Sequence, residues 1–348
     1  MATVKDVAAH AGVSVGTVSK VLSGDATVKD ALRAKVMAAV AALEYRPNMA
    51  ARALRTNKIN VIGLVVPDIT NPFFAQLAFR IETEAAERGH MVMLANTHDD
   101  LATEARQIAA LLRQAPRGLI IVATSDSSAA AGPIEVPVVS LDRRFQDSAL
   151  ISTDHAAGSA LVAAHLVGLG HRRIAYLCGP QQTEVGRQRL NGFRDEIARR
   201  AAAHPDLVIS VHEAQFDYES GEQIARRLFA QEDDLRPTAV AAASDQIALG
   251  VLRAARDMAL EVPRDVAVAG FDDITLAALS VPRLTTVSQP VQALAKAAVD
   301  RILGAAGATP AAAGASGDIF VEGALVVRGS TQARVPPPSG GGVGSGRV

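Results

Sequence analysis

The sequence predicts an α/β protein that consists of a small all-α head followed by a doubly wound core in two lobes. Its length of 348 residues corresponds to about two domains. Helical periodicity covers residues 1–45 without any strand pattern. From Ile59 onward, short apolar runs alternate with helical stretches, which is typical of parallel strands with helices on both faces of the sheet.

The composition is that of a folded chain without a membrane span. Apolar residues make up 49% and charged residues 20%, whereas disordered chains are poor in apolar residues. The longest uncharged stretch of the folded part, residues 155–171, contains three His and three Gly, so it does not span a membrane. Lys5 and Asp6 stand where a secretory signal needs an apolar run, so we expect a cytoplasmic protein. Cys178 is the single cysteine, which excludes an internal disulfide, and we expect its thiol to be buried.

Three short helices make up the predicted head. Two apolar stripes at helical spacing define the first and third helices, and they consist of Val4, Val7, Ala8 and Ala11 and of Leu32, Val36, Val40 and Leu43. Thr3 and Asp6 match a capping box at the start of the first helix. Between the stripes, Ser14 is placed to cap a second helix that turns Val18 and Val21 inward.

The outward face of this second helix is small and polar. It carries Gly16, Ser19, Lys20 and Ser23, and such a face can enter the DNA major groove, about 12 Å wide, without obstruction. Residues 1–58 have a net charge of +5, whereas the rest of the chain has −6. A basic head indicates binding to a polyanion, because Lys and Arg displace counterions from phosphate backbones. The pattern predicts a helix-turn-helix, and a helix pair that serves only packing is the alternative.

Short apolar runs predict the strands of the core. They include VIGLVV, MVMLA, GLIIVA, PVVSL, RIAYLC, PTAVAAA and DVAVAG. Each run is mostly apolar on both faces, as expected of buried parallel strands. Residues 304–317 lack an apolar stripe and are predicted to be a loop, and residues 332–348 are predicted to be a disordered tail.

Longer motifs follow one another along residues 2–331. They include TVKDVAAHAGVSVGTVSKVLSG, LEYRPNMAARALRT, IGLVVPDITNPFF, VVSLDRR, LVGLGHRRIAYLCGP, PTAVAAASDQIALG and VPRDVAVAGFDD. In this order, they resemble the lactose-repressor and galactose-repressor (LacI/GalR) family of bacterial transcription regulators. The resemblance implies a helix-turn-helix head, a hinge, and a two-lobed core of the periplasmic-binding-protein type that forms dimers.

The resemblance also implies the boundaries between these parts. They are a head at 1–46, a hinge helix and linker at 47–58, a core at 59–331 and the tail at 332–348. Within the core, one lobe is expected to take residues 59–154 and about 290–318. The other lobe is expected to take about 155–289 and 319–331.

DNA contacts in the head follow from the resemblance. Val15 and Gly16 open the recognition helix at its base-reading positions, and Thr17 occupies a phosphate-contact position. Val15 and Gly16 have no hydrogen-bonding side chain, unlike the polar pair of the founding repressor. We therefore expect Lys20 to contact a base, preferably guanine.

The hinge is too short to hold a helix by itself. Roughly eight helix-favouring residues follow Pro47, whereas an isolated helix needs about 12 to 15. By resemblance, two hinge helices pair in the minor groove, where Leu54 is the wedge that separates a base step. The expected DNA-binding residues are Val15, Gly16, Thr17, Ser19, Lys20, Asn48, Arg52, Leu54 and Arg55.

Candidate ligand contacts lie on loops that follow strands, where α/β lobes bind small molecules. The expected ligand-binding residues are Asp68, Phe74, Asp142, Arg189, Phe216, Asp245 and Asp272. The resemblance implies that Phe74 stacks on the ligand and that Arg189 and Asp272 clamp it. Because buried charges rarely persist unpaired, these two should face the cleft, a partner or each other. A helix cap is the alternative role for Asp68 and Asp245.

The expected ligand is a sugar or sugar derivative. The chain has no Trp, so Phe or Tyr must supply the stacking surface. A pyranose, a furanose and a nucleoside all stay open at this point.

Motifs of other functions are missing or misplaced. Residues 12–16 match G-x-S-x-G, but a helix precedes them where a nucleophile elbow needs a strand. His98 has no second His at ligand spacing, and the G-x-G-x-x-G and Walker patterns are absent. We therefore expect no catalytic residue, no metal and no cofactor. An enzyme or a solute-binding protein on the same core is the alternative.

The sequence predicts an effector-controlled transcription regulator, with repression as the favoured sign. It is expected to bind a pseudo-palindromic double-stranded DNA operator as a homodimer or a higher oligomer, without a membrane partner. Two heads that read half-sites require two-fold symmetry. Effector binding is expected to change how the two hinges are presented to each other, and so to change DNA affinity.

Overall fold

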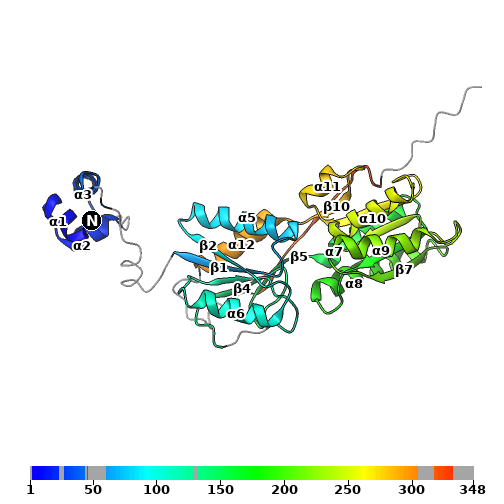
Figure 1. Ribbon diagram of the computed structural model, residues 1–348, viewed down its shortest axis with the longest axis horizontal. Coiled ribbons are helices and arrows are strands. Elements are labelled where there is room, and N and C mark those ends of the chain that lie inside the picture. The colour runs from blue at the N-terminus through cyan, green and yellow to red at the C-terminus, as the bar shows by residue number, and fades with distance from the viewer. Residues whose placement is uncertain are drawn as a thin grey trace, which may run out of the picture. The chain divides into compact units, whose positions relative to one another are not determined.

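The computed structural model describes residues 2–22, 27–43, 45, 60–128, 132–304 and 317–331. The chain divides into two compact units, Met1–Ile59 and Asn60–Val348 (Figure 1). The predicted hinge at 47–58 and the predicted tail at 332–348 lie outside the described residues, as do residues 305–316 of the predicted loop.

The first unit is the predicted three-helix head. Its helices are α1 (Val4–Ala11), α2 (Val15–Leu22) and α3 (Asp30–Ala42). Val7, Val18 and Val36, one from each helix, are fully buried in its core. The predicted capping box between Thr3 and Asp6 is present. Ser14 caps α2, because its Oγ accepts a hydrogen bond from the Thr17 amide at 3.1 Å.

The second unit contains two six-stranded sheets. The sheet of the N-terminal lobe has the order β11-β5-β4-β3-β1-β2, with β1 (Val61–Val66), β2 (Met91–Asn96), β3 (Leu119–Ile121), β4 (Val138–Leu141), β5 (Leu150–Thr153) and β11 (Ile319–Val321). The sheet of the C-terminal lobe has the order β12-β10-β9-β8-β6-β7, with β6 (Arg173–Cys178), β7 (Val208–Glu213), β8 (Ala239–Ala242), β9 (Ala267–Asp272), β10 (Thr285–Ser288) and β12 (Ala324–Val326). The pairing of β10 with β12 is antiparallel and all others are parallel, so the predicted α/β fold class is confirmed.

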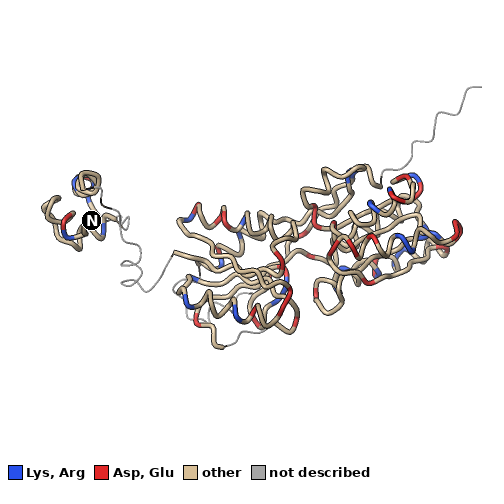
Figure 2. The backbone as a smooth tube through the Cα atoms, viewed as in Figure 1, with Lys and Arg blue, Asp and Glu red and all other residues tan. Residues whose placement is uncertain are grey.

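Helices cover both faces of each sheet (Figure 1). The N-terminal lobe has α5 (Pro72–Glu87), α6 (Leu101–Leu112) and α12 (Val291–Gly304), and the C-terminal lobe has α7 (His155–Gly168), α8 (Glu184–Ala201), α9 (Tyr218–Phe229), α10 (Asp245–Asp257) and the short α11 (Thr275–Leu279). Alternate residues of β1 face opposite sides, since Leu64 packs with α5 whereas Val65 packs with α6. The strands carry few charged residues, which lie mainly on helices and loops (Figure 2).

Within the described residues of the core, the chain crosses between the lobes after β5, after β10 and after β11. The third crossing differs from the expected boundary at 318/319. Ile319 pairs with Ile151 of β5, so residues 319–321 belong to the N-terminal lobe and the crossing follows Val321. A three-residue apolar run contains no local signal for the sheet that it joins, because strand pairing at a sheet edge is decided by distant partners.

Two further observations concern single predictions. Cys178 is a free, buried thiol, and burial raises its pKa. Among the described residues, no helix is both long and apolar enough to cross a bilayer.

Candidate functional site

The outer face of α2 carries the predicted base-reading residues. Val15 is 37% exposed, and Gly16 and Lys20 are also exposed, whereas Val18 and Val21 point into the core of the head. Thr17 and Ser19 are half-buried. The Thr17 hydroxyl lies 2.9 Å from Ser14 Oγ. The helix therefore presents small side chains and one cation outward, which is the surface expected of a helix that enters a groove.

The remaining predicted DNA contacts cannot be placed in the same way. Asn48, Arg52, Leu54 and Arg55 lie outside the described residues.

A cavity of about 520 Å³ lies between the two lobes of the second unit. The N-terminal lobe lines it with residues that include Asp68, Asn71, Phe74, Asp99 and Arg143, and the C-terminal lobe with residues that include Thr183, Gln215, Phe216 and Asp217. This volume is within the usual range for small-molecule sites. Three of the predicted ligand residues, Asp68, Phe74 and Phe216, line this cavity.

A second, much smaller hollow of about 20 Å³ is lined by buried charged groups. Its lining includes Phe74, Asp142, Arg143, Arg189, Phe216, Ser244 and Asp272. The space suffices for about one water molecule. A ligand that reaches these charges must therefore move side chains or separate the lobes.

The lobes touch across the cleft. Asp126 of the N-terminal lobe accepts a hydrogen bond from the amide of Glu184 at 3.0 Å and pairs with Arg187 at 2.5 Å, at the start of α8. Elsewhere, Gln76 of α5 donates to Thr275 of α11 at 3.2 Å. These contacts link the two lobes across the cleft.

Arg189 and Asp272 form an ion pair at the base of the cleft. Arg189 Nη2 lies 3.1 Å from Asp272 Oδ1, and both side chains are almost fully buried. Arg189 also donates to the Ala243 carbonyl at 2.5 Å and lies over the Phe271 ring at 3.9 Å. Gln289 donates to Asp272 at 2.8 Å. Burial raises the pKa of Asp272 to about 6, although Arg189 acts to lower it.

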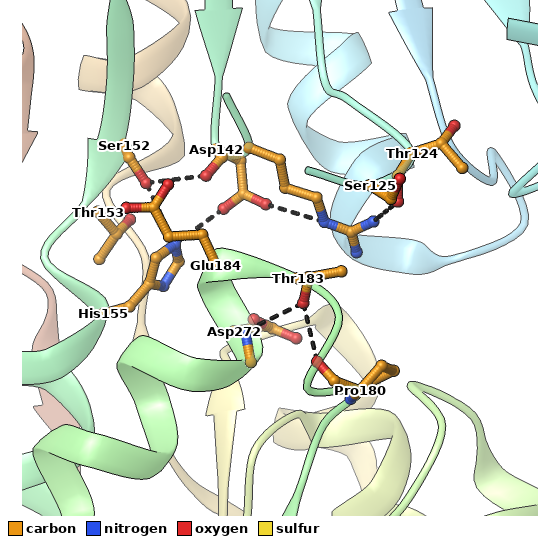
Figure 3. Close-up of polar contacts among 12 residues, drawn as sticks. Thr124, Ser125, Asp142, Ser152, Thr153, His155, Pro180, Thr183, Glu184 and Asp272 are labelled. Atoms are coloured by element: carbon orange, nitrogen blue, oxygen red, sulfur yellow. Dashed lines mark hydrogen bonds and ion pairs between the residues drawn. The ribbon is translucent and has the colours of Figure 1, made fainter. Parts of the chain in front are cut away.

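Asp142 faces this pair from the N-terminal lobe. Its Oδ1 lies 3.2 Å from His155 Nε2, and the two side chains point toward each other (Figure 3). Burial acts to raise the pKa of Asp142, but the contact with His155 and the charges of Arg189 and Arg143 hold this pKa below its usual value. His155 has a lowered pKa, because it is buried and close to Arg189. A neutral His155 accepts from Arg189 Nε–H through Nδ1, at 3.3 Å, so its proton lies on Nε2.

Arg143 lies between two aromatic rings, one from each lobe. Its guanidinium is 5.4 Å from the centroid of Phe74 and 5.9 Å from that of Phe216. Its Nη1 donates to the Thr124 carbonyl at 3.4 Å. Within the described residues, Arg143 Nε is buried and has no hydrogen-bond partner. It lies 4.0 Å from Asp142 Oδ2, beyond hydrogen-bond distance, and so keeps its hydrogen for a ligand that reaches the hollow.

Both roles predicted for Asp245, ligand contact and helix cap, need correction. Asp245 does not line either cavity, and its fully buried carboxylate accepts hydrogen bonds from the Ile274 amide and the Thr286 hydroxyl. The alternative role as a helix cap is also wrong, because Ser244 caps α10 and lies at the cleft. The local sequence does not decide which of two neighbouring residues caps a helix, because side chains one position apart on a helix point about 100° away from each other.

Asp68 lines the cleft as expected, but it does not cap the following helix α5, which was its alternative role. Asn71 caps α5 by accepting from the Phe73 amide at 3.0 Å. Asp68 instead accepts from the amide and hydroxyl of Thr70 at 2.9 and 2.8 Å.

Several cleft residues were not singled out from the sequence. They include Asn71, Asp99, Thr124, His155 and Gln289. His155 and Gln289 lie next to segments that cross between the lobes. Only the folded chain shows that His155 contacts Asp142 and that Gln289 contacts Asp272. A signal for Asn71 was present, because it directly precedes a proline that starts a helix after a strand.

Comparisons with known proteins agree with this architecture. Residues 3–48 match the family described as bacterial regulatory proteins, lacI family, and residues 163–331 match the periplasmic binding protein-like domain. The chain is 36% identical to the ribose operon repressor of Escherichia coli K12 over 309 residues, which cover 87% of this chain and 92% of that protein.

Two solved structures are similar to the whole chain or to its core. The lac repressor dimer bound to operator and the anti-inducer ONPF superposes with a TM-score of 0.80 at 30% identity, over 95% of this chain and 99% of that one. A LacI family regulator from Enterococcus faecium with bound ribose superposes with a TM-score of 0.65 at 25% identity, over 78% and 98% of the two chains.

Proposed function

The chain belongs to the lacI family of bacterial regulatory proteins, and we propose that it is a transcriptional repressor controlled by a small sugar in its cleft. One chain joins a three-helix unit that exposes a small polar helix face to a two-lobed unit with buried charges between its lobes. This combination carries the proposal, because an enzyme or a solute-binding protein on the same core does not need a DNA-reading head.

The head is proposed to dock α2 in the major groove of operator DNA. Lys20 is the cation on its exposed face and would contact a guanine edge, while Val15 would offer only apolar contact to a thymine methyl. Thr17 and Ser19 flank these positions and would approach the phosphate backbone.

A homodimer is proposed because apolar side chains are exposed along one edge of the N-terminal sheet. Among the described strands, β2 pairs with β1 alone, and its Met91 is 73% exposed. Met93 and Leu94 of the same strand are also exposed. Exposed apolar patches next to a sheet edge mark contact surfaces, and a second copy would bury this one while presenting two heads to two half-sites.

The cleft is proposed to bind an uncharged monosaccharide. Phe74 and Phe216 offer ring faces, whereas Asp142, Arg189 and Asp272 offer charged acceptors and donors for hydroxyl groups. Ribose is the first candidate, because similar proteins are a ribose operon repressor and a regulator with bound ribose. The effector would bridge the lobes and, through the predicted hinge segment, weaken the pairing of the two heads on DNA.

This function requires no catalytic step. The regulator would act on chromosomal DNA, in the bacterial cytoplasm, and its relatives are transcription regulators.

The function is tested by measuring binding to DNA from the upstream region of the gene itself. Fluorescence anisotropy of the purified protein should show specific binding that ribose reverses. Lys20→Ala should weaken specific binding about tenfold or more while changing non-specific binding much less. Lys35→Ala, a change on α3 of the same unit, is the matched control for lost charge. Turnover of a sugar without any DNA binding at low salt would instead support the enzyme alternative.

A further inference from the structure

The turn after β9 holds Asp272 in an unusual backbone conformation. Asp272 has a φ of 117° and Asp273 a φ of 53°. Residues other than glycine rarely adopt a φ near 117°, so surrounding contacts must hold the turn. This conformation directs the Asp272 carboxylate toward Arg189 and Gln289 at the base of the cleft.

Two successive amides of the turn are tied to Asp245. The Ile274 amide donates directly to Asp245 Oδ2 at 2.9 Å. The Asp273 amide donates to Thr286 Oγ1 at 3.4 Å, and the Thr286 hydroxyl in turn donates to Asp245 Oδ1 at 2.6 Å. Both carboxylate oxygens of Asp245 are therefore used, one directly and one through Thr286.

The position of Asp245 is also enforced by packing. A Cβ atom at Gly270 would lie 2.2 Å from Asp245 Oδ1, so only glycine at 270 leaves room for the carboxylate. Asp245 is fully buried and lines neither cavity. A buried carboxylate close to the Asp272 carboxylate is costly, which argues that it serves the turn rather than general stability.

The corresponding turn of the N-terminal lobe lacks such a support. Asp142 follows β4, which has the same place in its sheet as β9, and its φ of 62° is in a region that aspartate tolerates. Among the described residues between β3 and β4, there is no helix that corresponds to α10. The additional buried carboxylate, Asp245, is therefore found in the lobe whose turn has the more strained backbone.

We propose that Asp245 is a positioning residue that sets effector affinity by holding the Asp272 turn, without touching the effector. This inference rests on the proposed binding of a sugar in the cleft. The ties to the 273 and 274 amides can be measured whether or not the sugar is identified correctly.

The first test measures the turn in the ligand-free protein. Amide hydrogen exchange should show protection at Asp273 and Ile274, and Asp245→Asn should remove it, because an amide side chain offers one acceptor and places a donor against a donor. Glu196→Gln is the matched control, since Glu196 is a buried carboxylate of the same lobe that pairs with Arg199 and Arg200. Unchanged exchange at Asp273 and Ile274 in Asp245→Asn would overturn the proposal.

The second test measures ribose affinity by calorimetry. Asp245→Asn should weaken binding about tenfold, as expected for one lost buried hydrogen bond, while the DNA affinity of the ligand-free protein stays within about twofold. Glu196→Gln should leave ribose affinity unchanged even where it lowers the melting temperature. Equal loss of affinity in both variants would show a merely structural role.

A double-mutant cycle separates one shared turn from two independent sites. Thr286→Val removes the indirect tie, and its effect on ribose affinity should not add to that of Asp245→Asn. Full additivity would contradict the proposal. Failure of the wild-type protein to bind ribose would refute the proposed effector, and the exchange experiment would still decide the role of Asp245.

Discussion

The two lobes share one strand order, and each presents an aspartate to the cleft after the corresponding strand. Asp142 follows β4 and Asp272 ends β9, and both have a positive φ. Their partners differ, because Asp142 meets His155, which has a lowered pKa, whereas Asp272 meets the charged Arg189. The C-terminal lobe therefore has a close ion pair. In the N-terminal lobe, Arg143 Nε lies 4.0 Å from Asp142 Oδ2 and, among the described residues, makes no hydrogen bond.

Residues at equivalent positions of the two lobes therefore have different roles in binding. The C-terminal lobe supplies a rigid, internally paired acceptor, and the N-terminal lobe supplies a donor that a ligand can satisfy. Each of the following variants or conditions tests one side of this division.

The largest effect is expected from Asp272→Ala. The change leaves Arg189 buried without its counter-charge, so effector affinity should fall at least about a hundredfold, which is within the range for one broken buried pair. DNA affinity without effector should remain as in the wild type. Titration calorimetry and operator release measure the two properties. Asp257→Ala, at an exposed ion pair of the same lobe, is the control, and normal effector response in Asp272→Ala would remove Asp272 from the site.

Asp142→Asn should have a smaller effect, of about tenfold on effector affinity. Its contact His155 is expected to be neutral at pH 7, so the change removes a ligand acceptor without leaving His155 as an unpaired cation. The same calorimetric titration measures it, with the exposed Asp147→Asn as control. A loss as large as that of Asp272→Ala would contradict the proposed asymmetry.

Lowering the pH should act on Asp272 before it acts on Asp142. Asp272 has a pKa of about 6, whereas the pKa of Asp142 is held below its usual value, so acid neutralises Asp272 first. If the effector binds the carboxylate, affinity should fall about fourfold from pH 7 to pH 5.5, because the ionised fraction of Asp272 falls by that factor. The dependence should persist in Asp257→Ala and disappear in Asp272→Asn. A pH-independent affinity of the wild type would contradict the assignment.

The smallest effects are expected for the aromatic rings. Phe74→Leu and Phe216→Leu should each weaken binding roughly two- to threefold, because each change removes one cation–π contact with Arg143 and leaves the other in place. Phe320→Leu, at an exposed ring of the N-terminal lobe, should have no effect on effector affinity. Clearly unequal losses at Phe74 and Phe216 would show that the effector stacks on one lobe alone.

Much of the site could be predicted because local pattern determines where strands end. Six of the seven predicted ligand residues line the cavities, since each ends or follows a recognisable apolar strand or lies in the first two turns of the next helix. Asp245 was the exception, because the direction of its side chain depends on Gly270 and Thr286, which are distant in the chain. His155 could not be recognised either, since its contacts with Asp142 and Arg189 exist only in the folded chain.

The sequence alone determined the helices of the head, the strands of the core and the loops that carry the polar residues. These features depend on periodicity, caps and turn residues within a few positions, where short-range sterics and hydrogen bonds act. The tertiary structure decided which sheet residues 319–321 join, that Arg189 pairs with Asp272, and that Asp245 supports the turn beside them. Those outcomes depend on contacts between segments that lie about 30 to 170 residues apart, where no local pattern records the partner.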